Sequence, residues 1–285
     1  MRATTWLGLL CGSLLFSAPS EAQPKPAAPA PAAKPAAAKG GKPAIDTGPM
    51  VKKLESGEEG QIKSALDDLR VAGTSAASAA PAVAKVLEKG LSLPLTEAAM
   101  ETLGDLESEA GSPAIAVYLQ HRNVKLRRLA TKSLARTKGA SAGAALRHAL
   151  GDPDPVVRGT AASALGALKA KDAVPDLFVA LDHKVNEAAI SIGQLCSPEQ
   201  CDQLAGKVGK LPFDVVSGAL DQVLFRTADM TEDAKIKVIG RIRELGTIES
   251  NKFLKDVQKR WPANGSKRVK QSIDQAVIAT SGGTQ

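Results

Sequence analysis

An internal repeat constrains the fold of this chain more than any other feature of its sequence. Apolar and small residues recur at intervals of 31 residues through three copies: Leu103, Leu134 and Leu165; Ala99, Ala130 and Ala161; Ile115, Leu146 and Leu177; Leu119, Leu150 and Leu181. Within each copy, two successive segments place apolar residues three and four positions apart, the spacing of one side of a helix. We therefore expect each copy to be a helical hairpin, which is stable only when neighbouring copies cover its apolar side.

Residues that start helices stand at the ends of these segments. Asp154-Pro155 and Ser112-Pro113 place a capping residue before a proline at the first helical position, where the missing N–H is not needed. No segment alternates apolar and polar residues as a half-buried strand does, so almost no strand is expected. A longer turn is expected around 72–77. After residue 212 the pattern predicts these helices: Asp214–Arg226, Thr231–Leu245, Glu249–Lys259 and Ser266–Ala279. Which of them pair stays open, because one hairpin is expected to have lost or fused a helix.

The segment from Gly151 to Lys169, followed by 173–177 and Leu181, resembles a HEAT repeat of the short type that also occurs in phycobilisome-linker lyases. The resemblance is specific over about residues 95–210 and extends over 50–280. It implies an all-α fold: an α-solenoid of about six or seven stacked hairpins over residues 45–280, whose inner helices line a curved binding surface. It also implies that Asp154 and Arg158 are structural residues that bond between neighbouring repeats.

The N-terminus has the order of a secretory signal, with Arg2 before an apolar run over 6–16 and small residues that indicate cleavage after Ala22. The run is shorter than the roughly 20 apolar residues needed to span a bilayer. Lipidation at Cys11 is disfavoured because a bulky residue precedes it. We therefore expect a signal peptide over 1–22 and an exported protein, either periplasmic or secreted.

A linker rich in Ala, Pro and Lys is predicted over 23–44, since such a composition cannot bury a core and favours an extended spacer. A short polar tail is predicted over 281–285. The linker contributes four of the seven net positive charges, so residues 44–285 carry a net charge of only +3. With 3% aromatic residues, the chain has too few rings for a base-stacking nucleic-acid surface or an aromatic cofactor pocket. No nucleic-acid partner and no cofactor are expected.

Cys196 and Cys201 flank a segment, Ser-Pro-Glu-Gln, that has the pattern of a helix capping box. Cys196 then precedes the cap and Cys201 is the fourth helical residue, the two positions that touch in a hydrophobic staple. In an oxidising compartment this contact favours a disulfide. The alternatives are two buried thiols or a redox pair, and a metal site would need two further ligands.

Two other patterns carry candidate chemistry. Ser141 lies in a Gly-x-Ser-x-Gly sequence, but a nucleophile elbow needs a preceding strand, and here a turn between helices is expected. His121, His148 and His183 stand about 30 residues apart near the ends of second helices, without the His-Glu pairs of HEAT-like di-iron hydroxylases. Surface histidines are therefore favoured over a metal site.

Charge is segregated along the chain. Residues 95–109 contain five acids and no base, whereas 121–138 contain seven bases and no acid. Attraction between neighbouring repeats accounts for this pattern, and an anion-binding strip is the functional alternative. That first basic strip comprises Arg122, Arg127, Arg128, Lys132, Arg136 and Arg147. The second basic cluster comprises Lys252, Lys255, Lys259, Arg260, Lys267, Arg268 and Lys270. Solvated helix faces are the favoured interpretation of both sets.

The function that these features favour is a non-catalytic scaffold or adaptor in the cell envelope, which binds an envelope or extracellular protein on a curved helical surface. One alternative is a binder of an anionic envelope polymer through the basic helix faces, whose binding would depend steeply on salt. Another is an accessory protein related to lyases or hydroxylases, for which no catalytic residues are evident in the sequence.

Overall fold

The structure is a computed structural model that describes residues 43–281. The predicted signal peptide (1–22), nearly all of the predicted linker (23–44) and most of the predicted tail (281–285) lie outside the described residues. Within 43–281 the chain is all-α, as the sequence predicts, and its only bridge of strand type joins Val208 to Leu211 in a loop. No helix in this range combines the length and the apolar character that a membrane crossing requires.

The N-terminal part of the stack consists of eight α-helices and three short 3₁₀ segments. The helices are α1 (Gly48–Glu55), α2 (Glu59–Ala72), α3 (Ala80–Glu88), α4 (Leu93–Asp105), α5 (Ser112–Ala116), α6 (Val124–Thr137), α7 (Ala140–Ala149) and α8 (Pro155–Ala167). The 3₁₀ segments are η1 (Gly73–Ala79), η2 (Glu109–Gly111) and η3 (Val117–Gln120), and η1 occupies the place where the longer turn is predicted.

The C-terminal part continues with seven helices and one 3₁₀ segment. They are η4 (Lys171–Ala173), α9 (Val174–Asp182), α10 (Glu187–Leu195), α11 (Pro198–Ala205), α12 (Phe213–Phe225), α13 (Glu232–Leu245), α14 (Ile248–Arg260) and α15 (Lys267–Ser281). Every helix predicted after residue 212 is present within two residues of its expected bounds. Among these helices, α13 packs mainly on α11 and α15, and α14 packs mainly on α15.

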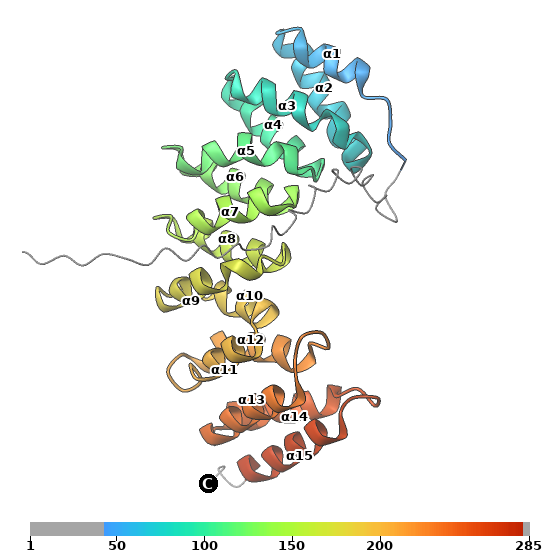
Figure 1. Ribbon diagram of the computed structural model, residues 1–285. Coiled ribbons are helices and arrows are strands. Elements are labelled where there is room, and N and C mark those ends of the chain that lie inside the picture. Colours follow the sequence, from blue (N-terminus) through green and yellow to red (C-terminus); the bar gives the residue numbers. More distant parts are fainter. Residues whose placement is uncertain (1–42, 282–285) are drawn as a thin grey trace, which may run out of the picture. The chain divides into compact units, whose positions relative to one another are not determined.

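The helices stack in chain order from α1 to α15 (Figure 1), and most of them pack on the next helix and on the next but one. The even-numbered helices make a continuous row, in which each of α2 to α12 packs on the next even-numbered helix. The odd-numbered helices make a second row that is less regular: α5 packs closely on α7, whereas backbone contacts between α7 and α9 are sparse. The described chain is thus an α-solenoid of the predicted size.

The 31-residue repeat forms the core of this stack. Leu103, Leu134 and Leu165 are fully buried at equivalent places in successive even-numbered helices, and the small residues Ala130 and Ala161 are also fully buried. Small side chains at the contacts allow the helices to approach closely. One such approach joins α10 to α12, where Gly193 faces the backbone of Ala219.

Candidate functional site

Cys196 caps the C-terminal end of α10, and Cys201 lies in the first turns of α11. Their sulfur atoms are at disulfide distance, with Cα atoms 5.3 Å apart, and both side chains are buried. Ser197 accepts a hydrogen bond from the backbone N–H of Gln200, whose side chain accepts one from the backbone N–H of Ser197. The capping box that the sequence predicts is therefore present, and it sets the turn that brings the two cysteines together.

Arg226, which follows α12, reaches this turn, and the sequence analysis does not single it out. Its guanidinium donates hydrogen bonds to the carbonyl oxygens of Gln194, at 2.9 Å, and Cys196, at 2.6 Å. It also lies 3.4 Å from the Sγ atom of Cys201. Burial lowers the pKa of Arg226. These hydrogen bonds satisfy carbonyl groups at the C-terminal end of α10, so Arg226 stabilises the turn that carries the disulfide.

The first basic strip is largely consumed by ion pairs between neighbouring repeats. Two of its arginines bind carboxylates of the next turn in a bidentate manner: Arg127 binds Asp152, at 2.8 and 3.1 Å, and Arg128 binds Asp154, at 2.9 and 2.6 Å. The hydrogen bond from Arg128 is the main cause that lowers the pKa of Asp154 to about 2. As the resemblance implies, Asp154 bonds between neighbouring repeats.

The other members of the strip divide into paired arginines and exposed bases. Arg136 pairs with Asp105 in the preceding repeat, and Arg147 pairs with Asp172 and Asp176 in the following one. Arg122 and Lys132 are exposed and have no ion pair among residues 43–281. Attraction between neighbouring repeats thus accounts for most of the strip, and the structure does not gather its six members into one open anion site.

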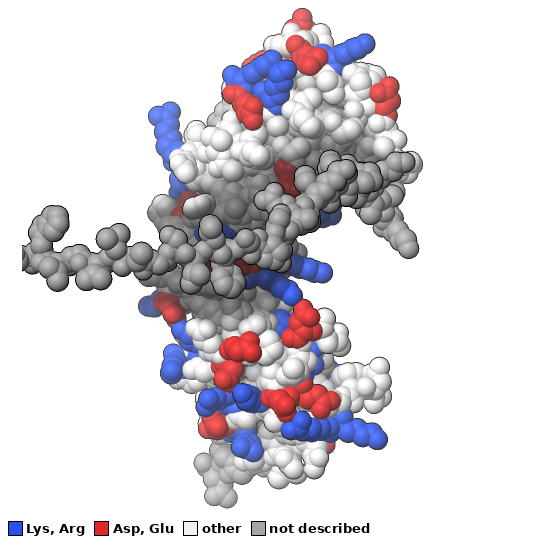
Figure 2. Space-filling model, viewed as in Figure 1, with Lys and Arg blue, Asp and Glu red and all other residues white. Residues whose placement is uncertain are grey.

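The second basic cluster keeps more free charge. Arg260 pairs with Asp221 and Asp256, and Arg268 pairs with Asp233. The five lysines of the cluster are exposed and make no ion pair within the described part of the chain: Lys252, Lys255, Lys259, Lys267 and Lys270. Over the C-terminal helices, Figure 2 shows acidic and basic side chains interspersed on the face that it draws.

A recurring arginine holds the turn before α6 and the turn before α8. Arg127 donates to the carbonyl oxygen of His121, six residues earlier, at 3.1 Å. Arg158, its equivalent 31 residues on, donates to the carbonyl oxygens of Asp152, at 2.8 Å, and Pro153, at 3.0 Å. Arg158 therefore bonds to the turn of its own repeat. The implied bond between repeats is absent for Arg158 within residues 43–281, because His183 stands where an acid would be needed.

Two equivalent grooves lie between successive odd-numbered helices. The α5–α7 groove, of about 380 Å³, is lined by Ala116, Leu119, Gln120, Ala145, His148, Ala149, Gly151 and Asp152. The α7–α9 groove, of about 750 Å³, is lined by Arg147, His148, Leu150, Gly151, Asp152, Pro153, Arg158, Asp176, Val179, Ala180 and His183. When 31 is added to each residue number of the first lining, every resulting position but one belongs to the second lining. The second groove is the larger because α7 and α9 are less closely packed.

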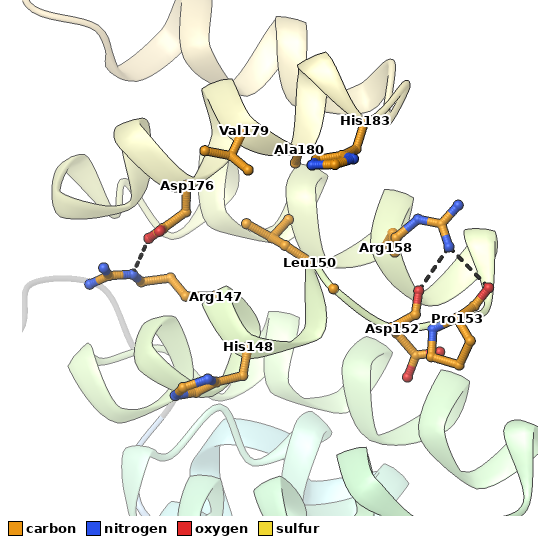
Figure 3. A pocket seen from close by; sticks show the side chains of 11 residues that line it. Arg147, His148, Leu150, Asp152, Pro153, Arg158, Asp176, Val179, Ala180 and His183 are labelled. Atoms are coloured by element: carbon orange, nitrogen blue, oxygen red, sulfur yellow. Dashed lines mark hydrogen bonds and ion pairs between the residues drawn. The ribbon is translucent and has the colours of Figure 1, made fainter.

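Figure 3 shows how charge is distributed in the α7–α9 groove. Arg147 and Asp176 form an ion pair at one end, and Arg158 bonds to the turn at 152–153 at the other. Leu150 and Val179 lie between the two ends. The groove thus combines an apolar middle with charged ends.

A row of exposed side chains follows the same odd-numbered helices. Val117 on η3, His148 on α7 and Val179 on α9 occupy equivalent repeat positions, and all three are exposed, Val117 to 72% and Val179 to 58%. His148 lines both grooves and Val179 lines the second. We call this set the exposed row.

The remaining candidates of the sequence analysis lie apart from one another. Ser141 is in the first turn of α7, where its hydroxyl and backbone N–H contact the carboxylate of Glu109. His121 stacks on Tyr118, whereas His148 and His183 are exposed at the α7–α9 groove. Within residues 43–281 no three His, Cys, Asp or Glu side chains are grouped to hold a metal ion.

Comparisons with known structures give weak overall likenesses to repeat proteins. The complex of CpcE and CpcF of phycocyanin lyase from Nostoc sp. PCC7120 is 20% identical, covering 88% of this chain and 100% of that chain, with a TM-score of 0.42. A designed armadillo repeat protein in complex with the peptide (KR)4 is 15% identical, covering 83% and 100%, with a TM-score of 0.43. Human deoxyhypusine hydroxylase in complex with glycerol is 14% identical, covering 83% and 96%, with a TM-score of 0.35.

The family comparison agrees with the repeat seen in the fold. No curated protein matches the chain. The model of HEAT repeats matches residues 111–190 and 144–224, which are the helices from α5 to α12 and include both grooves. The central part of this chain, residues 111–224, therefore resembles HEAT repeats in sequence.

Proposed function

We propose that this protein is a non-catalytic scaffold, exported to the cell envelope, that binds another protein on its odd-numbered helices. The observation that carries the proposal is the exposed row of Val117, His148 and Val179, of which His148 and Val179 line the grooves. Two exposed valines and a histidine that repeat in register on a solenoid, next to recesses that admit a side chain, are suited to a protein partner. The signal-like N-terminus and the linker support an exported, tethered protein.

Crosslinking in the native envelope tests this function. We expect the wild-type chain to retain a protein partner through high-salt washes, because apolar contacts are not screened by salt. The double variant Val117→Asp, Val179→Asp should retain roughly tenfold less of the same partner, since it places charge in the contact. Val71→Asp is the matched control, because Val71 is 89% exposed on α2, away from the exposed row.

The outcomes of this experiment separate clearly. Equal retention by the double variant and by Val71→Asp would remove the exposed row from the interface, and retention of no protein would refute the scaffold. The intact mass of the protein from the envelope tests the export itself: a chain that starts at Gln23 supports it, and a chain that keeps residues 1–22 contradicts it.

A second candidate function, binding of an anionic polymer, is favoured by the five unpaired lysines of the second basic cluster. A sulfated polysaccharide is a suitable probe. Its binding should fall steeply between low and high salt, and should be lost when Lys252, Lys255 and Lys259 are changed to Glu. Binding that survives these three substitutions would exclude the second basic cluster as the site.

A further inference from the structure

Among the positions at which the two grooves of the HEAT repeats differ, one carries an acid only in the first groove. In the α5–α7 groove the position is occupied by Asp152, whose carboxylate receives the bidentate hydrogen bonds of Arg127. In the α7–α9 groove the equivalent residue, 31 positions on, is His183. The arginine of the repeat is kept as Arg158, so the second groove has the cation without the acid that neutralises it in the first.

Arg158 is held in place by hydrogen bonds, but not all of its N–H donors have a partner among residues 43–281. Its Nη1 atom donates to the carbonyl oxygens of Asp152 and Pro153, which orients the guanidinium. Its Nε and Nη2 atoms have no hydrogen-bond partner among residues 43–281, and the corresponding atoms of Arg127 are those that bind Asp152. The guanidinium edge with which Arg127 binds a carboxylate is thus free in Arg158, the equivalent residue of the next repeat.

The other charges at the α7–α9 groove are already paired. Asp152 is bound by Arg127, with only 6% of its side chain exposed, and Asp176 is bound by Arg147. These carboxylates therefore do not compensate Arg158, whose charge has no acidic partner within the described residues. A planar guanidinium with two free N–H groups on one edge matches a carboxylate geometrically.

We propose that the α7–α9 groove receives an acidic side chain of the partner protein, and that its carboxylate binds Arg158 as Asp152 binds Arg127. This inference rests on the proposed function and specifies its partner: a protein segment with an Asp or Glu flanked by apolar residues. The apolar stem of that segment lies against Leu150, Val179 and Ala180, which line the middle of the groove. The α7–α9 groove has a volume of about 750 Å³, about twice that of the α5–α7 groove, which leaves room for this segment.

Selection from a displayed library of random twelve-residue peptides tests the inference on the full mature chain. Peptides retained by the wild-type chain should be enriched in Asp or Glu. Changing the acid of a selected peptide to its amide should weaken binding about tenfold or more, the usual value of a charge-assisted hydrogen bond. The same loss is expected when Arg158→Gln removes the charge of the groove.

Two further variants make the test specific. His183→Asp supplies the missing acid from within the chain, so it should pair with Arg158, abolish peptide binding and raise the thermal midpoint. Lys132→Gln is the matched control, because Lys132 is an exposed, unpaired base on α6 that lines neither groove. It should bind the peptides as the wild-type chain does.

Several results would overturn the inference. They are the absence of any selected peptide, peptides without acidic residues, or equal binding by the wild-type, Arg158→Gln and His183→Asp chains. Displacement by millimolar inorganic phosphate but not by free glutamate would assign the site to phosphate groups instead. If the envelope partner is retained equally by Arg158→Gln and the wild-type chain, the scaffold function stands and only this inference falls.

Discussion

The contact between α10 and α12 makes a quantitative prediction about packing. A Cβ atom added to Gly193 would lie 2.9 Å from the carbonyl carbon and the Cα atom of Ala219, and closer still to its carbonyl oxygen. These are backbone atoms of a buried helix, so they cannot turn aside as the end of a flexible side chain can. Since carbon atoms pack at about 3.5–4.0 Å, Gly193→Ala has to push the two helices apart.

A second glycine allows the steric cost to be isolated. Gly240 is inside α13, and a Cβ atom added there meets no atom within 4 Å. Both substitutions gain about 0.5–1 kcal/mol because alanine loses less conformational entropy in a helix. Only Gly193→Ala also carries the cost of overpacking, about 1–3 kcal/mol. The difference between the two variants therefore measures the close approach alone.

The assay is thermal and urea unfolding followed by helical circular dichroism. Gly240→Ala should be more stable than the wild-type chain, and Gly193→Ala should be less stable than Gly240→Ala by about 1–3 kcal/mol. In a folded region of this size, each kcal/mol corresponds to about 2–4 °C in the unfolding midpoint. Equal stabilisation by the two substitutions would refute the close contact between α10 and α12.

Two further predictions concern the turns between repeats. The hydrogen bond from Arg128 lowers the pKa of Asp154 to about 2, below the usual value of about 3.9 in an unfolded chain, so its stabilisation is present above about pH 4 and is lost as the pH falls towards 2. Asp154→Asn should therefore flatten the loss of stability between pH 4 and pH 2 in urea unfolding, and an unchanged profile would contradict the pairing. Reduction of the disulfide between Cys196 and Cys201 should cost about 2 kcal/mol, because the closed loop is short. A thiol reagent should label both cysteines of the unfolded protein only after reduction, and labelling without it would show free thiols.

Much of the fold can be predicted from the sequence because the same pattern of buried residues occurs in several copies of the repeat. The equal spacing of Leu103, Leu134 and Leu165 predicts the repeated helices. The capping box between Cys196 and Cys201 predicts that the two cysteines lie close together. Each rests on local spacing, which the helix converts directly into geometry. The bounds of the helices after residue 212 follow from local spacing, but their pairing does not, because it depends on contacts between helices.

The candidate site is less predictable because it depends on which side chains meet across repeats. In the sequence, Arg127 belongs to a run of bases, and Arg158 has a structural role implied by the resemblance. Their contacts within residues 43–281 show that Arg127 binds a carboxylate and that Arg158 does not. A signal for this was present, since Asp152 and His183 differ at equivalent positions. Arg226 gave no such signal, because its role arises from the stacking of α12 on α10.

The order of the stack also has a consequence for how the chain folds. Each closely packed pair of helices within residues 43–281 is adjacent or next but one along the chain, so helix packing does not depend on a distant segment. Chains with such local topology fold quickly, because each step closes only a short loop. A chain that crosses a membrane unfolded, N-terminus first, can then fold hairpin by hairpin as it emerges. In the exported protein that we propose, the first repeats would be complete before the last repeats cross the membrane.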